Sequence, residues 1–129
     1  MIGMTRQECD RASLVIVVDD DDAVRNSLKF ALEVEGFAVH LYAGGAELLD
    51  SPELGNCACL VIDQNMPGMS GLDTVRQLRD RNVSVPAILI TGHLSAFLRA
   101  RAFAAGIGVV EKPLLGNALV EGIRGAIKH

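Results

Sequence analysis

The chain has 129 residues, of which 50% are hydrophobic, and a formal net charge of −4. This length suits one domain, and this apolar content excludes an intrinsically disordered chain. The longest aliphatic run, Leu14–Val18, is far shorter than the ~20 residues of a membrane-spanning helix. No charged-then-apolar leader opens the sequence. We therefore expect a cytoplasmic protein with no signal peptide and no membrane segment.

The negative charge is concentrated in one place. Asp19–Asp22 supply four of the 16 acidic residues, and the other acids balance the 12 Lys and Arg. No stretch gathers Lys and Arg into the basic stripe that nucleic-acid binding requires. We therefore expect a local acidic site, and no direct binding of nucleic acid by this chain.

The three cysteines, Cys9, Cys57 and Cys59, are an odd number in a chain without a secretion signal, which favours reduced thiols. Cys57 and Cys59 have no second Cys or His pair at zinc-ligand spacing, so a zinc site is disfavoured. At the two-residue period of a strand, both side chains would lie on one face and pack as small hydrophobic groups.

Short apolar runs alternate along the chain with amphipathic segments. The first run, Leu14–Val18, is apolar on both faces, as in a buried strand. The elements that follow are a helix over 22–35 ended by Gly36, a strand over 37–42, a short helix over 46–49 closed near Pro52, a strand over 58–62 that ends at Asp63, a helix carrying Leu72, Val75 and Leu78, a strand over 87–90, a helix over 95–105, a strand over 109–110 and a helix over 115–127.

Five strand–helix repeats predict an α/β domain with one parallel sheet, helices on both faces and right-handed crossovers. We assign this domain to residues 13–129, after a flexible N-terminal tail over 1–12. In such sheets the ligand site lies beyond the carboxyl ends of the strands. The residues at those ends are therefore the candidate functional residues.

Four of the five strands end in residues that carry chemistry. These residues are Asp19 and Asp20 after the first strand, Asp63 after the third, Thr91 after the fourth, and Glu111, Lys112 and Pro113 after the fifth. The second strand ends only in Tyr42 and, two residues on, a pair of glycines. We therefore expect three carboxylates, one hydroxyl and one ammonium group to converge at one edge of the sheet.

Three ionised carboxylates within ~5 Å of one another repel by roughly 3 kcal/mol per pair at an effective dielectric constant of ~20. A divalent cation removes this conflict, and oxygen ligands without His or Cys favour Mg²⁺. Mg²⁺ keeps positions for phosphate oxygens, while Lys112 adds a positive charge and Thr91 a hydroxyl donor. One carboxylate can then act as a nucleophile and form an aspartyl-phosphate.

Each of these residues also has an ordinary structural explanation. Acids before a helix cap it and complement its dipole, and we assign that role to Asp21 and Asp22. Asp63 and Thr91 are each followed by residues typical of a turn. The joint occurrence of polar residues at the strand ends favours a single site over unrelated turns.

Four stretches together resemble the receiver domain of two-component response regulators, over Leu14 to Ile127. The stretches are Val17–Arg25, Leu60–Gly71, Ile88–His93 and Glu111–Pro113. The second and third resemble the FixJ-type subgroup, whose members are mostly transcription regulators. The resemblance implies a flavodoxin-like (βα)5 fold, a doubly wound five-stranded parallel sheet of order 2-1-3-4-5.

The resemblance also implies a role for individual residues. Asp63 corresponds to the phosphoacceptor. Asp19 and Asp20 correspond to the acidic pair that holds Mg²⁺, with Asp20 favoured as the direct ligand. Asn65 corresponds to the residue whose backbone carbonyl completes that metal site, to which Asp63 also contributes.

Two further residues are assigned by the same resemblance. Thr91 corresponds to the switch hydroxyl, and Lys112 to the lysine that contacts the phosphoryl group. The bond between Lys112 and Pro113 corresponds to one that is usually cis in the family. The implied partner is a sensor histidine kinase. The implied activity is that of a phosphoacceptor that catalyses its own phosphorylation and slow dephosphorylation, and not that of a conventional enzyme.

The surface expected to switch comprises the fourth helix (95–105), the fifth strand (109–110) and the fifth helix (115–127), for a partner or for a phosphorylation-driven homodimer. This surface includes Arg99, Arg101 and Phe103. The family usually has an aromatic residue three positions before the lysine, where this chain has Val109, and frequently Phe where it has Leu114. The expected phosphorylation chemistry is therefore intact, while the usual coupling of Thr91 to an aromatic residue is in doubt.

Two alternatives remain open. Residues 20–24 also fit the opening motif of haloacid-dehalogenase-type phosphatases, with Asp20 as nucleophile and Asp22 as acid–base. The chain is short for that class, lacks its late acidic pair and leaves Asp63 without a role. A docking domain that acts without phosphorylation is the other alternative, and Val109 is consistent with it.

Overall fold

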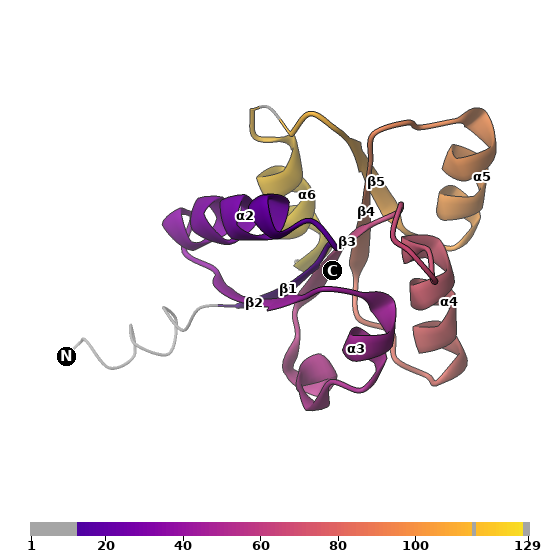
Figure 1. The fold of residues 1–129 in the computed structure, drawn as a ribbon, viewed down its shortest axis with the longest axis horizontal. Coiled ribbons are helices and arrows are strands. Elements are labelled where there is room, and N and C mark those ends of the chain that lie inside the picture. Colours follow the sequence, from indigo (N-terminus) through magenta and orange to yellow (C-terminus); the bar gives the residue numbers. More distant parts are fainter. Residues whose placement is uncertain (1–12, 115, 128–129) are drawn as a thin grey trace.

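The computed structural model describes residues 13–114 and 116–127. Within them, five parallel strands form one sheet in the order β2-β1-β3-β4-β5 (Figure 1). The strands are β1 (Leu14–Val18), β2 (Ala38–Tyr42), β3 (Cys59–Asp63), β4 (Ala87–Thr91) and β5 (Gly108–Glu111). The helices are α2 (Asp22–Val34), α3 (Gly45–Leu49), α4 (Gly71–Asp80), α5 (Ala96–Ala104) and α6 (Ala118–Ile127). The predicted fold and strand order are confirmed.

The structure adds one element and moves some boundaries. A short 3-10 helix, η1 (Pro52–Asn56), lies where the sequence predicted only the close of a helix. It begins at Ser51, whose hydroxyl accepts from the Glu53 N–H, with Pro52 in its first turn. The helix predicted from 115 begins at Ala118, and the tail predicted over 1–12 lies outside the described residues.

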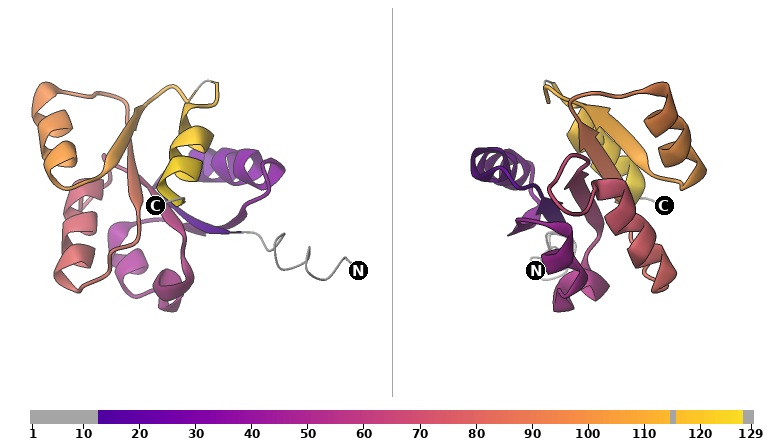
Figure 2. Two further views of the ribbon diagram at one scale, coloured as in Figure 1. Left: turned by 180° about the vertical axis from the view of Figure 1, so that it is seen from behind. Right: turned by 45° about the vertical axis from the view of Figure 1, so that its right-hand side comes forward.

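The sheet separates two apolar cores, because successive strand residues point to opposite faces. Ile16 and Val18 pack against α3, α4 and α5, whereas Val15 and Val17 pack against α2 and α6. Figure 1 and the left panel of Figure 2 show these two groups of helices on opposite sides of the sheet. No helix in the described part of the chain has both the length and the apolar character needed to cross a membrane.

The acidic run after β1 starts α2 as predicted. The Asp21 carboxylate accepts a hydrogen bond of 3.2 Å from the Val24 N–H, and Asp22 lies in the first turn. Both placements complement the positive end of the helix. This local capping sets the path by which the chain leaves β1, just beyond Asp19.

The prediction that Cys57 and Cys59 share one face is wrong. Cys57 packs in the core beneath α3 and α4, and Cys59 in the core beneath α2 and α6. Cys57 lies before β3, at the end of η1, so the strand alternation does not extend to it. Burial raises the pKa of Cys57 to about 11 and that of Cys59 to about 12, so both are protonated thiols at neutral pH.

Candidate functional site

Three carboxylates meet where the neighbouring strands β1 and β3 end. One oxygen from each of Asp19, Asp20 and Asp63 lies within 4.8 Å of the others. Asp19 and Asp63 are 1% and 4% exposed, whereas Asp20 is exposed. The register that pairs Val18 with Ile62 brings the two strand ends to the same level of the sheet. The sequence-predicted acidic cluster is thus formed by residues far apart in the chain.

Lys112 reaches this cluster from the far edge of the sheet. Its Nζ lies 3.5 Å from Asp63 Oδ1 and 3.9 Å from Asp19 Oδ2. Its backbone N–H donates to the Thr91 carbonyl at 2.8 Å, which places the residue directly beyond β5. The bond from Lys112 to Pro113 is cis, as the family resemblance implied. One ammonium group therefore faces three carboxylates.

The site holds more negative charge than its own residues neutralise. Burial and the Asp19 carboxylate raise the pKa of Asp63, against the lowering effects of Lys112 and of a hydrogen bond from the Asn65 backbone N–H. Asp19 Oδ2 and Asp63 Oδ1 are buried and, apart from their ion pairs with Lys112, have no hydrogen-bond partner among the described residues. A buried polar atom left unsatisfied costs about 1–3 kcal/mol. These two oxygens therefore mark where a further positive group would be stabilised.

The chemistry of the donor set fits a hard divalent cation. Carboxylate oxygens are the ligands that Mg²⁺ prefers, and the cluster in the described residues includes no His or Cys. Asp20 faces solvent, so the cluster is open on one side. An open site leaves room for water or phosphate oxygens on a bound ion. Asp19 Oδ2, Asp63 Oδ1 and the exposed Asp20 carboxylate thus provide both the oxygen ligands and the open side that a Mg²⁺ site needs.

Arg25 is a residue of this region that the sequence analysis did not single out. Its Nη1 donates to the Asp19 backbone carbonyl at 2.6 Å, and its Nη2 pairs with Asp22 Oδ1. The Arg25 side chain is only 16% exposed. The signal in the sequence was an arginine one turn into a helix that follows an acidic run, a pattern that also suits a simple surface ion pair.

The backbone of α4 packs tightly against the phosphoacceptor candidate. A Cβ built on Gly71 would lie 2.6 Å from the Asp63 carbonyl oxygen and 2.9 Å from Leu89 Cδ2. The Gly71 N–H donates to the Gln64 carbonyl at 3.1 Å. Only glycine allows this approach, so the first residue of α4 holds the end of β3 in place.

Thr91 lies at the predicted edge, but its hydroxyl is engaged locally. Oγ1 donates to the His93 carbonyl at 3.1 Å and accepts from the His93 N–H at 3.2 Å. It borders a cavity of about 350 Å³ that Asn65 and Phe97 also line. The structure therefore brings Thr91 to the same edge without directing its hydroxyl at the carboxylates.

Two other residues point away from the acidic cluster. The Tyr42 hydroxyl, at the end of β2, lies 2.6 Å from Ser51 Oγ and donates to Glu53 Oε1 at 2.8 Å. The Asp22 side chain is 82% exposed and pairs with Arg25. Asp22 is therefore poorly placed for the acid–base role of the phosphatase alternative.

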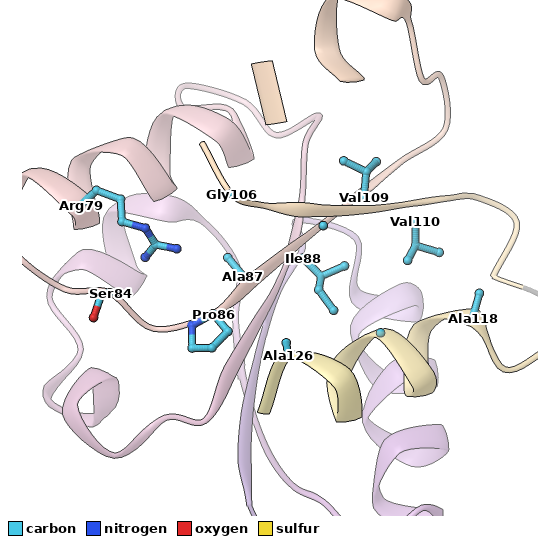
Figure 3. A pocket seen from close by; sticks show the side chains of 12 residues that line it. Arg79, Ser84, Pro86, Ala87, Ile88, Gly106, Val109, Val110, Ala118 and Ala126 are labelled. Atoms are coloured by element: carbon cyan, nitrogen blue, oxygen red, sulfur yellow. The ribbon is translucent and has the colours of Figure 1, made fainter. Parts of the chain in front are cut away.

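A second hollow lies at the opposite end of β4 and β5. It has a volume of about 580 Å³, and Figure 3 shows Ile88 and Val110 of the sheet near Ala118 and Ala126 of α6, with Arg79 reaching in from α4. Its lining is mostly small and apolar, and contains no carboxylate. It therefore lacks the carboxylates that form the acidic cluster.

The comparisons with known proteins agree with this geometry. The family model described as the response regulator receiver domain matches residues 15–124. The chain is 35% identical over 124 residues to the response regulator protein TodT of Pseudomonas putida, covering 95% of this chain and 55% of TodT. It is 38% identical over 117 residues to the transcriptional regulatory protein FixJ of Rhizobium meliloti, covering 89% of this chain and 57% of FixJ.

The solved structures give the same result. The crystal structure of FixJ-N superimposes with a TM-score of 0.82 at 37% identity, covering 92% of this chain and 96% of that one. The chain spans about half the length of the curated relatives it matches. The fold, the strand-end carboxylates and these matches together establish that the chain belongs to the receiver domain family of two-component response regulators.

Proposed function

We propose that the chain accepts a phosphoryl group on Asp63 in a Mg²⁺-dependent reaction. The observation that carries this proposal is the pair of buried oxygens without a hydrogen-bond partner, Asp63 Oδ1 and Asp19 Oδ2, beside the Lys112 ammonium group. Asp19, Asp20, Asp63 and the backbone carbonyl of Asn65 would hold the ion. When bound, Mg²⁺ would supply positive charge to the carboxylates and to the phosphoryl oxygens.

The chain's own residues account for the rest of the reaction. An Asp63 carboxylate oxygen attacks the phosphorus of a phosphohistidine on the partner, the new O–P bond forms, and the P–N bond breaks with its electron pair going to the imidazole nitrogen. Lys112 stays beside Asp63 and attracts the phosphoryl oxygens, which is positioning and charge stabilisation rather than proton transfer. Water then hydrolyses the acyl phosphate and restores the carboxylate.

The surface around α2 supports a protein phosphodonor, which we assign to a sensor histidine kinase. Ala23, Ser27, Phe30 and Val34 recur at helical spacing and are all exposed and uncharged. Phe30 and Val34 are 72% and 67% exposed. A hollow of about 500 Å³ between α2 and the segment at Lys112 continues this surface to the site. A helical partner could therefore pack on α2 beside the phosphoacceptor.

The surface that responds is assigned to α5, β5 and α6, where it would bind a partner or a second copy of the chain. Phe97 and Phe103 are 70% and 85% exposed on α5. The helix carries Arg99 and Arg101 and no acidic residue. Exposed aromatic and arginine side chains are the residues enriched at protein interfaces.

Phosphorylation by acetyl phosphate tests this function directly. The wild-type chain should take up one phosphoryl group with Mg²⁺ and none with EDTA, as measured by intact mass. Asp63→Asn should abolish the label while the circular dichroism spectrum is retained. Undiminished label on that variant would refute the assignment of Asp63.

The same samples separate the two alternatives. A phosphatase would hydrolyse p-nitrophenyl phosphate with repeated turnover and lose this activity in Asp20→Asn. A docking domain independent of phosphorylation would show no Mg²⁺-dependent label at all. Stoichiometric label that disappears only with Asp63 would exclude both.

A further inference from the structure

The turn after β1 is held by contacts on three sides. The Asp19 N–H donates to the Tyr42 carbonyl at 3.2 Å, which ties the residue to β2. The Asp19 carbonyl accepts from Arg25 Nη1 at 2.6 Å, and Asp19 Oδ1 accepts from the Asp21 N–H at 2.9 Å. Oδ2 is the one polar atom of Asp19 without a hydrogen-bond partner among the described residues, and Lys112 Nζ lies 3.9 Å from it.

Arg25, a residue of α2, is the side chain that contacts the Asp19 carbonyl. Its guanidinium group makes two contacts with fixed geometry, one to the Asp19 carbonyl and one to the Asp22 carboxylate. It therefore links the last residue before the turn to the first residue of the helix. The planar guanidinium holds its donors in a fixed arrangement, which the compact ammonium group of a lysine on its flexible stem does not reproduce.

We infer that Arg25 is a positioning residue for the cation site, which fixes the Asp19–Asp20 turn so that Asp19 Oδ2 and the Asp20 carboxylate face Asp63. This inference rests on the proposed Mg²⁺ function of these three carboxylates. Arg25 itself contributes no ligand, since its guanidinium is a cation without an acceptor atom, and it instead donates to the Asp19 carbonyl and to Asp22. Its effect on the cation is transmitted through the geometry of the turn, as with other residues that orient metal ligands.

The charge of Arg25 and its hydrogen bond to Asp19 predict opposite changes in Mg²⁺ affinity when the residue is replaced. A positive guanidinium next to three carboxylates repels a divalent cation, so loss of its charge alone would strengthen Mg²⁺ binding. Loss of its hydrogen bond to Asp19 would instead let the turn move and weaken Mg²⁺ binding. The direction of the change in affinity therefore distinguishes positioning from simple electrostatics.

The experiment compares the Mg²⁺ affinity of the wild-type chain with that of Arg25→Gln, Arg25→Lys and Lys29→Gln, by isothermal titration of MgCl₂. Lys29→Gln is the matched control, because it removes one positive charge from the same helix while Lys29 contacts only Glu33 among the hydrogen bonds and ion pairs described. Arg25→Gln should weaken binding about tenfold, in line with the loss of a residue that orients metal ligands. Arg25→Lys should show a smaller weakening, and Lys29→Gln unchanged or slightly stronger binding.

A measurement without metal accompanies the titration. Hydrogen exchange at the Asp21 amide, followed by NMR, should be faster in Arg25→Gln, because its acceptor Asp19 Oδ1 belongs to the released turn. If Arg25→Gln fails to fold by circular dichroism, Arg25→Lys is compared with wild type in the same two measurements.

The results separate failure of this inference from failure of the proposed function. If the wild-type chain binds Mg²⁺ and the Arg25 variants bind it equally well or more tightly, the positioning role is overturned while the site stands. If the wild-type chain does not bind Mg²⁺, the proposed function fails and the inference falls with it. The inference is supported if Mg²⁺ binding is weaker in the Arg25 variants but not in Lys29→Gln, and if the Asp21 amide exchanges its hydrogen faster in Arg25→Gln.

Discussion

At the carboxyl edge of the sheet, two carboxylates are buried, and Asp63, 4% exposed, has Lys112 Nζ 3.5 Å from its carboxylate. On α5 the arrangement is reversed, because Phe97 and Phe103 are 70% and 85% exposed. The carboxylates at the edge of the sheet are removed from water, which is unfavourable for charged groups, whereas the phenylalanines of α5 leave apolar surface exposed to water. A small cation would offset the first, whereas the second is a surface of the kind that protein partners cover. If the proposed function holds, the two regions differ in the kind of partner each would bind.

The largest expected effect tests the buried side of this comparison. Among the described residues, Lys112 supplies the ammonium group that faces Asp63, and Lys112→Met removes it together with its lowering effect on the Asp63 pKa. We expect the rate of labelling by acetyl phosphate to fall about 100-fold, as when one preorganised charge donor is removed from an active site. Lys29→Met is the control for loss of a lysine. An equal rate in both variants would show that Lys112 does not act on the phosphoryl group.

Gly71→Ala tests whether the edge is held rigidly. The added methyl group would lie 2.6 Å from the Asp63 carbonyl oxygen, so β3 or α4 must shift. We expect the free energy of unfolding in urea to fall by about 3 kcal/mol, as for an overpacked core position. Gly125→Ala is the matched control within α6, since its methyl group would meet nothing within 4 Å, and it should be stabilising by up to ~1 kcal/mol. A tolerated Gly71→Ala would mean that this contact is loose.

Asp63→Asn should stabilise the metal-free chain at neutral pH by about 1–2 kcal/mol, because it removes the negative charge of a buried carboxylate that lies beside Asp19. The pKa of Asp63 is raised, so the folded wild-type chain binds this proton more tightly than the unfolded chain. Wild-type stability therefore falls as pH rises through the folded pKa, and the advantage of the variant disappears below the ordinary carboxyl pKa. Urea titrations across pH measure this difference.

Mg²⁺ provides the complementary check on Asp63. The ion should stabilise the wild-type chain more than Asp63→Asn, because the variant lacks one of the three carboxylates. A wild-type chain that is the more stable of the two without Mg²⁺ at neutral pH would contradict the view that the site carries uncompensated charge.

The smallest expected effect on the stability of the isolated chain comes from replacing the exposed phenylalanines of α5. Phe97→Ser and Phe103→Ser together should change the free energy of unfolding by only about 0.5 kcal/mol or less per site, as for other surface positions. Labelling of Asp63 should be unchanged. Self-association of the phosphorylated chain on a sizing column should be reduced. Loss of labelling in these variants would show that α5 belongs to the site rather than to a separate surface.

Much of the fold could be predicted because local and global signals agree. The fully apolar run Leu14–Val18 and the N-cap at Asp21 gave the right elements with boundaries correct within a few residues. The prediction that Cys57 and Cys59 share one face failed because the alternation of β3 was extended to a residue before the strand begins. Cys57 belongs to the end of η1, so its side chain follows the geometry of a 3-10 turn and not the alternation of β3.

The candidate site was predictable to the extent that strand ends determine it. Asp19, Asp20, Asp63 and Lys112 converge because parallel strands place their carboxyl ends on one edge. The orientation of side chains within that edge could not be predicted, since it depends on local hydrogen bonds. The Thr91 hydroxyl bonds to His93, and Arg25 turns inward to Asp19, and neither contact has a periodic signal in the sequence.

The network at the end of β2 has a consequence for how the chain behaves in concentrated solution. β2 is an edge strand, and an exposed edge is a template for sheet growth between molecules. The Tyr42 hydroxyl forms hydrogen bonds with Ser51 and Glu53, and His40 pairs with Glu53. These contacts connect the start of η1 to the side chains of β2. We expect these contacts to keep η1 beside the end of β2 and so to hinder the pairing of a second molecule's strand there, which would reduce aggregation.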